Sequence, residues 1–279
     1  MNAAEAFLGA APEATQRLAA SRWEAGRMCE GSELVAEEVP VALAYNGITH
    51  AVMLASPLDL EDFALGFTLS ERIVRQRRDV YDIEVEETAR GIVVSLRIAA
   101  GAMARMKGAR AARTGKTGCG LCGVESLEYF EREACLPEAP PAPAARFDPA
   151  ALHRAMAAMA ARQQLHHATG AVHAAAWADP EGRLDCVRED VGRHNALDKL
   201  VGSLARAGAE PPPGFAVVTS RASFEMVQKA ARAGFGMLAA ISAPTALAVR
   251  MAEEAGLTLA GFVRGGRHVV YSHPERMLA

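Results

Sequence analysis

The second half of the chain alternates short apolar runs with longer amphipathic stretches, and this pattern limits the fold more than any other feature of the sequence. Buried strands are expected at 215–219, 237–241 and 258–263, and helices at about 193–205, 223–233 and 245–255. Such alternation is typical of a sheet that is covered by helices. We therefore predict a layered α/β domain over residues 150–279.

The first half reads as paired strands around one helix. A strand-like stretch at 33–54 contains Asn46-Gly47, which is typical of a two-residue hairpin turn, and further strands are expected at 83–87 and 92–98. We predict an α+β domain over residues 31–136, after a frayed or disordered lead-in over 1–30. Because prolines are frequent at 137–149, we place a stiff linker there, between the two domains.

Charge, hydropathy and cysteine content exclude several classes of protein. The net charge of -3 does not suit a generic nucleic-acid binder. No apolar run approaches the roughly 20 residues of a membrane helix, and the first residues lack the apolar core of a secretory signal. Five scattered cysteines do not suggest a disulfide framework. We expect a reduced, cytoplasmic protein that binds neither nucleic acid nor a membrane.

Cys119 and Cys122 form a Cys-x-x-Cys pair within a glycine-rich run, directly after a stretch at 101–118 that has five cations and no acid. Such a pair can be half of a zinc site, a redox dithiol or a sulfur carrier. Structural zinc needs four ligands, and the other cysteines are isolated, so only a site assembled across domains or a dimer stays open. A thioredoxin-type dithiol opens a helix after a strand, whereas this pair is predicted to lie in a loop. Nearby cations stabilise a thiolate, so we favour a sulfur carrier over two incidental thiols.

Three further polar segments follow strands of the second half, at 188–195, 219–223 and 262–267. Asp190 could cap the helix that follows it, and exposed amides there could receive an anion. Polar residues at the carboxyl ends of strands are where α/β ligands bind. The third segment consists of Phe262, Val263, Arg264, Gly265, Gly266 and Arg267. It suits a phosphate or guanine contact, although a plain hairpin turn with surface arginines explains it about equally well.

His173 lies in a segment similar to the His-x-Glu motif of zinc deaminases, but residue 175 is alanine. No Pro-Cys-x-x-Cys follows in the second half, so both the acid/base group and the zinc ligands of that chemistry are missing. We therefore expect His173 to be packed or hydrogen-bonded rather than catalytic.

Taken in order, these segments resemble the FdhD family of formate dehydrogenase accessory sulfurtransferases. The resemblance rests on 66–72, 117–123, 170–175, 189–199, 220–229 and 261–267. It implies a homodimer that takes sulfur from a cysteine desulfurase and passes it to the bis-molybdopterin guanine dinucleotide cofactor, with molybdenum or tungsten, before insertion into formate dehydrogenase. It also implies that the C-terminal domain has a cytidine-deaminase-like fold.

The resemblance further implies roles for individual residues. Cys119 would carry the persulfide, and Cys122 would assist or relay. Residues 262–267 would contact the cofactor, for which GDP would be a partial mimic, and no structural metal is expected. A non-catalytic chaperone that binds the molybdenum cofactor is the alternative function. A vestigial nucleotide deaminase is nearly excluded, because the glutamate and the thiols are absent.

Overall fold

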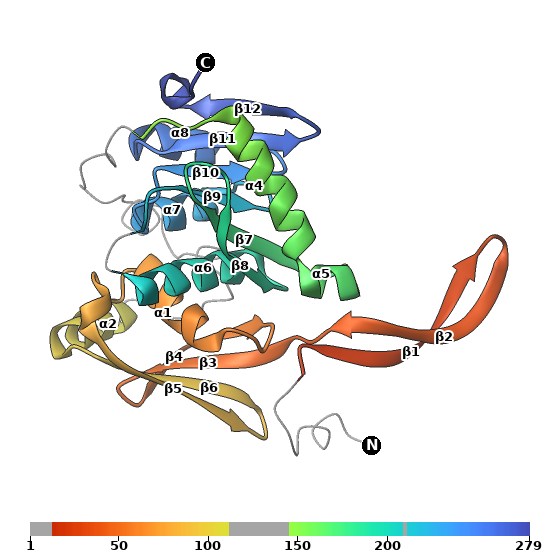
Figure 1. The fold of residues 1–279 in the computed structure, drawn as a ribbon. Helices are drawn as coiled ribbons and strands as arrows, with labels where there is room; N and C mark the ends of the chain where they lie inside the picture. The colour runs from red at the N-terminus through yellow and green to blue at the C-terminus, as the bar shows by residue number, and fades with distance from the viewer. Residues whose placement is uncertain (1–12, 112–144, 209–210) are drawn as a thin grey trace.

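The computed structural model describes residues 13–111, 145–208 and 211–279 (Figure 1). The strands are β1 (Thr15–Glu24), β2 (Arg27–Ala36), β3 (Val39–Tyr45), β4 (Ile48–Ala55), β5 (Val80–Thr88), β6 (Gly91–Ile98), β7 (His173–Ala178), β8 (Leu184–Asp190), β9 (Phe215–Val218), β10 (Met237–Ala240), β11 (Thr258–Arg264) and β12 (Arg267–Ser272). The helices are α1 (Leu60–Ser70), α2 (Ala100–Ala111), α4 (Pro149–Arg162), α5 (Gln164–Thr169), α6 (Arg193–Ala207), α7 (Phe224–Arg232) and α8 (Ala246–Glu254), with short 3-10 helices at Arg77–Asp79 and Pro274–Arg276. Within the described ranges, no helix combines the length and apolarity needed to cross a membrane.

The described strands form a two-stranded hairpin of β1 and β2, a four-stranded sheet and a six-stranded sheet. The four-stranded sheet has the order β4-β3-β6-β5, and the six-stranded sheet has the order β12-β11-β10-β9-β7-β8. Both sheets are mixed, because β3 pairs with β6 in parallel and β9, β10 and β11 are parallel to one another. The α/β class and the α+β character of the first half are thus confirmed. The likeness of the C-terminal part to cytidine deaminases stays a prediction.

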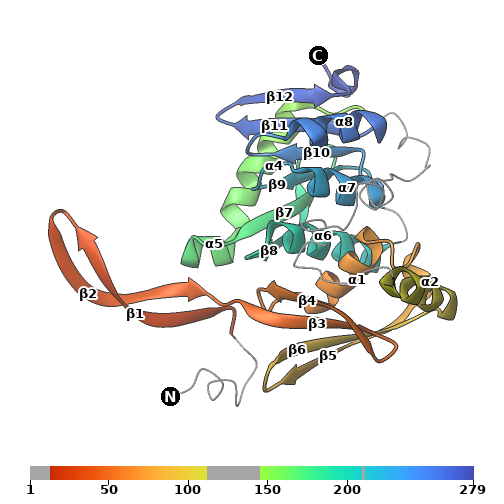
Figure 2. The same cartoon turned by 180° about the vertical axis from the view of Figure 1, so that it is seen from behind.

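The expected frayed lead-in over 1–30 is wrong for its described part, because β1 and β2 pair along their whole length. Figures 1 and 2 show this hairpin extending away from the body of the protein. Its tip leaves Trp23 68% exposed and Met28 58% exposed. An alternating apolar pattern arises only where one strand face is buried. The arm has little buried surface, so its sequence carries no such pattern.

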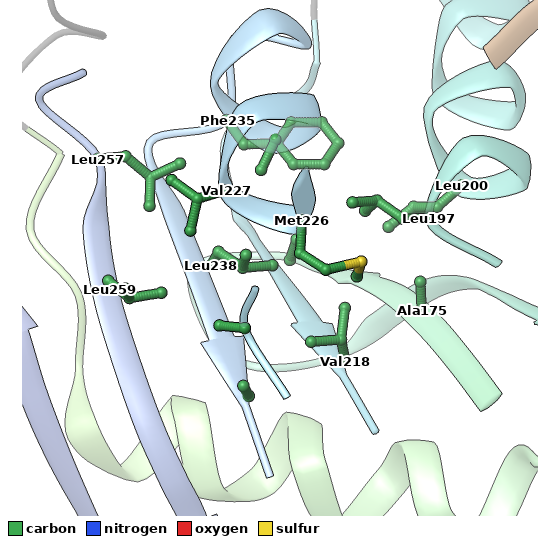
Figure 3. Close-up of a cluster of buried hydrophobic side chains, with 14 of the residues drawn as sticks. Ala175, Leu197, Leu200, Val218, Met226, Val227, Phe235, Leu238, Leu257 and Leu259 are labelled. Carbon is green, nitrogen blue, oxygen red and sulfur yellow. The ribbon is translucent and has the colours of Figure 1, made fainter. Parts of the chain in front are cut away.

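The six-stranded sheet is covered by helices on both faces. Val218, Leu238 and Leu259 point toward the layer of α6, α7 and α8, as Figure 3 shows. The intervening residues, among them Val217 and Ala239, pack on α4 from the other side. Parallel strands that are buried on both faces read as continuous apolar runs. This burial explains why the sequence predicted β9, β10 and β11.

Helix α1 lies between the four-stranded sheet and α6, so the two halves of the chain share a packed layer (Figure 2). Gly66 of α1 and Gly202 of α6 make this contact close. A Cβ atom on Gly66 would overlap the carbonyl oxygen of Asp198, and one on Gly202 would overlap that of Asp62. The helix backbones therefore approach within a distance that only glycine permits.

The expected linker at 137–149 lies largely outside the described residues, and the domain boundary stays a prediction.

Candidate functional site

The thiol pair that the sequence singled out, Cys119 and Cys122, lies outside the described residues. The structure describes the start of the basic stretch before it, which forms α2 and leaves Arg105 exposed. The roles of the two cysteines therefore stay predictions. The structure does describe the second expected site, around residues 262–267.

One edge of the six-stranded sheet collects the polar segments that the sequence pointed to. β8, β9, β10 and β11 run in the same direction, so their carboxyl ends meet at this edge. We call the loops that follow them, at 190–195, 219–223, 241–245 and 261–267, the sheet rim. Backbone hydrogen bonds tie the loops together: Thr245 N donates to Ala222 O at 3.1 Å, and Phe262 N donates to Ser242 O at 3.2 Å. The last three loops are therefore connected, at the place where α/β sheets usually bind ligands.

The β11–β12 hairpin forms one end of the rim. Gly265 and Gly266 both have positive φ, of 57° and 73°, as a two-residue hairpin turn requires. Phe262 also has a positive φ of 53°, within an irregularity of the β11–β12 register, which is uncommon for a bulky residue. Arg264 and Arg267 are paired across the turn and are exposed, and the Arg264 guanidinium lies 6.0 Å from the centroid of the Phe262 ring. The turn thus presents two exposed arginines that are cross-strand partners, an arrangement suited to phosphate oxygens.

The other part of the rim, after β8 and β9, contains two polar atoms that lack a partner among the described residues. The Nε of Arg193 and the Oγ of Ser223 are buried, and neither has a hydrogen-bond partner among the described residues. Beside them, His194 Nε2 lies 2.9 Å from Glu225 Oε2. Buried polar atoms in proteins are nearly always hydrogen-bonded. Oxygen atoms of a bound ligand could pair with both.

His173 lies at the start of β7 and is half-buried. Burial lowers the pKa of its imidazole, and the neighbouring Arg193 lowers it further. The ring is therefore neutral near pH 7. A half-buried neutral ring on a strand agrees with the expectation of a packed residue.

Asp190 and Asn195, at the two ends of the first rim loop, make their contacts in the interior. Asp190 forms a fully buried ion pair with Lys199 at 2.7 Å and accepts a hydrogen bond from Ser56 N at 3.0 Å. Asn195 Nδ2 donates to Leu54 O at 2.8 Å. The expected capping of α6 by Asp190 is wrong, because Gly192 is the N-cap and no side chain caps it. Asp190 instead joins the second half of the chain to the end of β4.

A second buried cluster joins α1, α6 and α7. Lys229 Nζ lies 2.9 Å from Asp198 Oδ2 and 2.8 Å from Glu71 Oε1. Ser70 Oγ donates to Asp198 at 2.6 Å, and the ammonium of Lys229 lies 5.3 Å from the centroid of the Phe67 ring. Burial alone would lower the pKa of Lys229, but the two carboxylates raise it above its ordinary value, so the ammonium stays charged. Sequence reasoning missed this cluster, because no local spacing links residues 158 positions apart.

A histidine pair connects the β11–β12 hairpin to α4. His268 of β12 has its Nδ1 3.1 Å from Nε2 of His153 on α4. In a hydrogen bond between two imidazole rings, one nitrogen donates its proton and the other accepts it. The accepting nitrogen must therefore be unprotonated. Burial lowers the pKa of His268, and His153 lowers it further.

We expect this pair to make the protein less stable in mild acid. The unfolded chain binds a proton at residue 268 near the usual value of 6.5, whereas the folded protein binds it only at lower pH. The contribution to stability is thus present above pH 6.5 and is lost as the pH falls toward the folded pKa. The measurement is the urea midpoint at about pH 7.5 and about pH 5.5, which should differ less in His268→Gln than in the natural protein. The control is His167→Gln, at an exposed position. If the urea midpoint changed equally between the two pH values in both variants, the histidine pair would not be the cause of the lower stability in acid.

Comparison with known proteins places the chain in a family. Residues 36–278 match the model of the FdhD/NarQ family. The sulfur carrier protein FdhD of Cupriavidus necator is 56% identical over 268 residues, which cover 96% of this chain and 92% of that protein. The sulfur carrier protein FdhD of Bordetella petrii is 58% identical over 247 residues, which cover 88% of this chain and 87% of that protein.

A solved structure shares the fold. A protein from Desulfotalea psychrophila, described as a candidate formate dehydrogenase accessory protein, superposes with a TM-score of 0.75 at 24% identity. The superposition covers 95% of this chain and 100% of that one. Because the family model spans most of the sequence and both FdhD relatives are more than half identical to it, this chain belongs to the FdhD/NarQ family.

Proposed function

We propose that this protein carries persulfide sulfur from a cysteine desulfurase to the bis-molybdopterin guanine dinucleotide cofactor that formate dehydrogenase requires. One observation carries the proposal: relatives named sulfur carrier proteins are 56% and 58% identical over most of the chain. The Cys-x-x-Cys at 119–122 supplies the thiols that such a function needs. The metal of the cofactor is molybdenum or tungsten, and the site of action is the cytoplasm.

The thiols perform the first step. The Cys119 thiolate attacks the terminal sulfur of the desulfurase persulfide, the S–S bond of the donor breaks, and the desulfurase cysteine leaves as a thiolate. Cys119 then holds the persulfide, and Cys122 assists or relays the sulfur to the cofactor. Thiolate chemistry of this kind is favoured by nearby cations, and five precede the pair in the sequence.

The sheet rim performs the second task, which is to hold the acceptor. Arg264 and Arg267 are exposed and can bind phosphate oxygens in pairs. Arg193 Nε and Ser223 Oγ, which are buried and have no hydrogen-bond partner in the described part of the chain, offer a further donor and a donor or acceptor. Phe262, Val263, Gly265 and Gly266 shape the hairpin that carries the arginines. A homodimer would present this rim twice.

Sulfur labelling tests the carrier function. The protein is incubated with a cysteine desulfurase and sulfur-labelled cysteine, and the labelled peptide is mapped by mass spectrometry. We expect the label on Cys119 and its loss in Cys119→Ala, whereas Cys29→Ser, which changes an exposed thiol on the β1–β2 arm, should retain it. Full labelling together with formate dehydrogenase activation by Cys119→Ala would refute the assignment.

A hairpin variant separates the carrier from a non-catalytic chaperone. We expect Arg264→Ala/Arg267→Ala to accept sulfur normally and to lose most activation of formate dehydrogenase, because only the acceptor contact is removed. If the natural protein took up no label and the hairpin variant still lost activation, the chaperone function would be favoured instead.

A further inference from the structure

A cavity of about 500 Å³ lies where α1, α6 and the end of α7 meet the segment before β5. Its lining includes Pro211 and Phe235, which precede β9 and β10. The cavity therefore lies at the amino ends of these parallel strands, whereas the sheet rim lies at their carboxyl ends. It is separate from the site described above.

The lining of this cavity is strongly basic. Four arginines contribute to it, namely Arg75, Arg77, Arg78 and Arg232, and its described lining contains no aspartate or glutamate. Arg75, Arg77 and Arg78 are exposed on one short segment and repel one another, in a chain whose net charge is -3. An arrangement of this kind is stabilised when an anion binds. We call these residues the arginine cavity.

The arginines are held in place by the local backbone. Ile73 and Val74 are buried directly before them, and the amide of each donates to Thr68 O, at 3.0 Å and 3.3 Å. Arg72 adopts a left-handed conformation with φ 55°, which a non-glycine residue keeps only where the surroundings fix it. The segment that carries three of the four guanidinium groups is thus anchored to α1.

Two of the guanidinium groups are further oriented by backbone carbonyls. Arg77 Nη1 donates to Val80 O at 2.6 Å, and Arg232 Nη1 donates to Ser70 O at 3.0 Å. These bonds fix the orientation of both guanidinium groups. Oriented guanidinium forks bind phosphate oxygens with little further loss of side-chain freedom.

The remaining wall is apolar. Leu69 of α1, Leu204 of α6 and Phe235 line it. The cavity falls within the range of about 300–1,000 Å³ that is typical of small-molecule sites. We propose that the arginine cavity binds a phosphate-bearing small molecule, whose phosphates lie on the arginines and whose organic part lies on the apolar wall. Because helices from both halves form the cavity, the ligand also bridges them.

Calorimetric titration of the full chain tests the proposal, with inorganic diphosphate and ADP as separate probes. We expect binding that weakens at least about tenfold in Arg75→Ala/Arg78→Ala, because two charged contacts are lost. Arg90→Ala, which removes an exposed arginine at the β5–β6 turn, is the matched control and should bind as the natural protein does. Melting temperatures without ligand establish that the variants are folded.

The outcomes separate the possible ligands and the two sites. Tighter binding of ADP than of inorganic diphosphate supports an organic phosphate that uses the apolar wall, and equal binding supports the inorganic anion. Binding that is lost in Arg264→Ala/Arg267→Ala but kept in Arg75→Ala/Arg78→Ala would place the ligand on the sheet rim and overturn the proposal. The absence of binding by either probe at about 1 mM would overturn it as well. None of these results depends on sulfur labelling, so the sulfur-carrier function stands or falls separately.

Discussion

Replacing Lys229 with methionine is expected to lower the free energy of unfolding by about 3–5 kcal/mol. The substitution leaves the buried carboxylate of Asp198 without its ammonium partner, which lies 2.9 Å away in the natural protein. The side chain of Asp198 is only 1% exposed, so water cannot replace the lost partner. The measurement is the free energy of unfolding at zero denaturant, extrapolated from urea-induced unfolding.

Two further variants determine whether the effect arises from the buried charge. Arg183→Met removes an arginine that is 76% exposed and paired with Asp179, and it should cost about 1 kcal/mol or less. The double variant Asp198→Leu/Lys229→Met removes both charges and should be more stable than Lys229→Met alone. If Lys229→Met cost no more than Arg183→Met, the buried cluster would not hold the two halves together.

The elements that the sequence predicted are those with a strong periodic pattern. β9, β10 and β11 are buried on both faces and appear in the sequence as short apolar runs. The turn at Asn46-Gly47 was predictable because its two positive φ angles favour these two residues. The β1–β2 arm was not predictable, because an exposed hairpin has no buried face to impose alternation.

The candidate site, too, was predictable from the sequence only in part. The sequence indicated the segment 262–267 because glycines and arginines in a turn are a local signal. It gave no account of why segments 66–72, 189–199 and 220–229 should occur together. In the structure, side chains of all three meet in buried polar contacts between the two halves of the chain. Pairings across more than a hundred residues depend on the tertiary fold, and no spacing within one segment reveals them.

These contacts bear on the proposed sulfur transfer. The rim that would hold the acceptor belongs to the second half, whereas the thiols belong to the first half of the sequence. A fixed relation between the halves would let one protein surface receive sulfur while another holds the cofactor. The buried ion pairs and the close packing of α1 on α6 are the features that fix this relation.

Replacing Gly66 with alanine should therefore affect the free energy of unfolding in two opposing ways, through helix propensity and through packing. In an isolated helix the change would gain about 1 kcal/mol, because alanine favours the helix more than glycine does. Here a Cβ atom would overlap the Asp198 carbonyl on α6, so α1 must move away from its partner. Overpacking against backbone cannot be relieved by a rotamer change, and we expect a net loss of about 3 kcal/mol in the free energy of unfolding.

Gly101→Ala is the matched control, since Gly101 also lies in a helix, α2. Among the described residues, a Cβ there would meet only the Arg105 side chain, at 3.7 Å. This variant should be neutral or more stable by up to about 1 kcal/mol. Gly202→Ala should behave like Gly66→Ala, because its Cβ would overlap the Asp62 carbonyl on α1. Opposite signs for Gly66 and Gly101 would show that the helix contact, and not helix propensity, sets the requirement for glycine. Stabilisation by Gly66→Ala would instead mean that α1 and α6 do not pack this closely in solution.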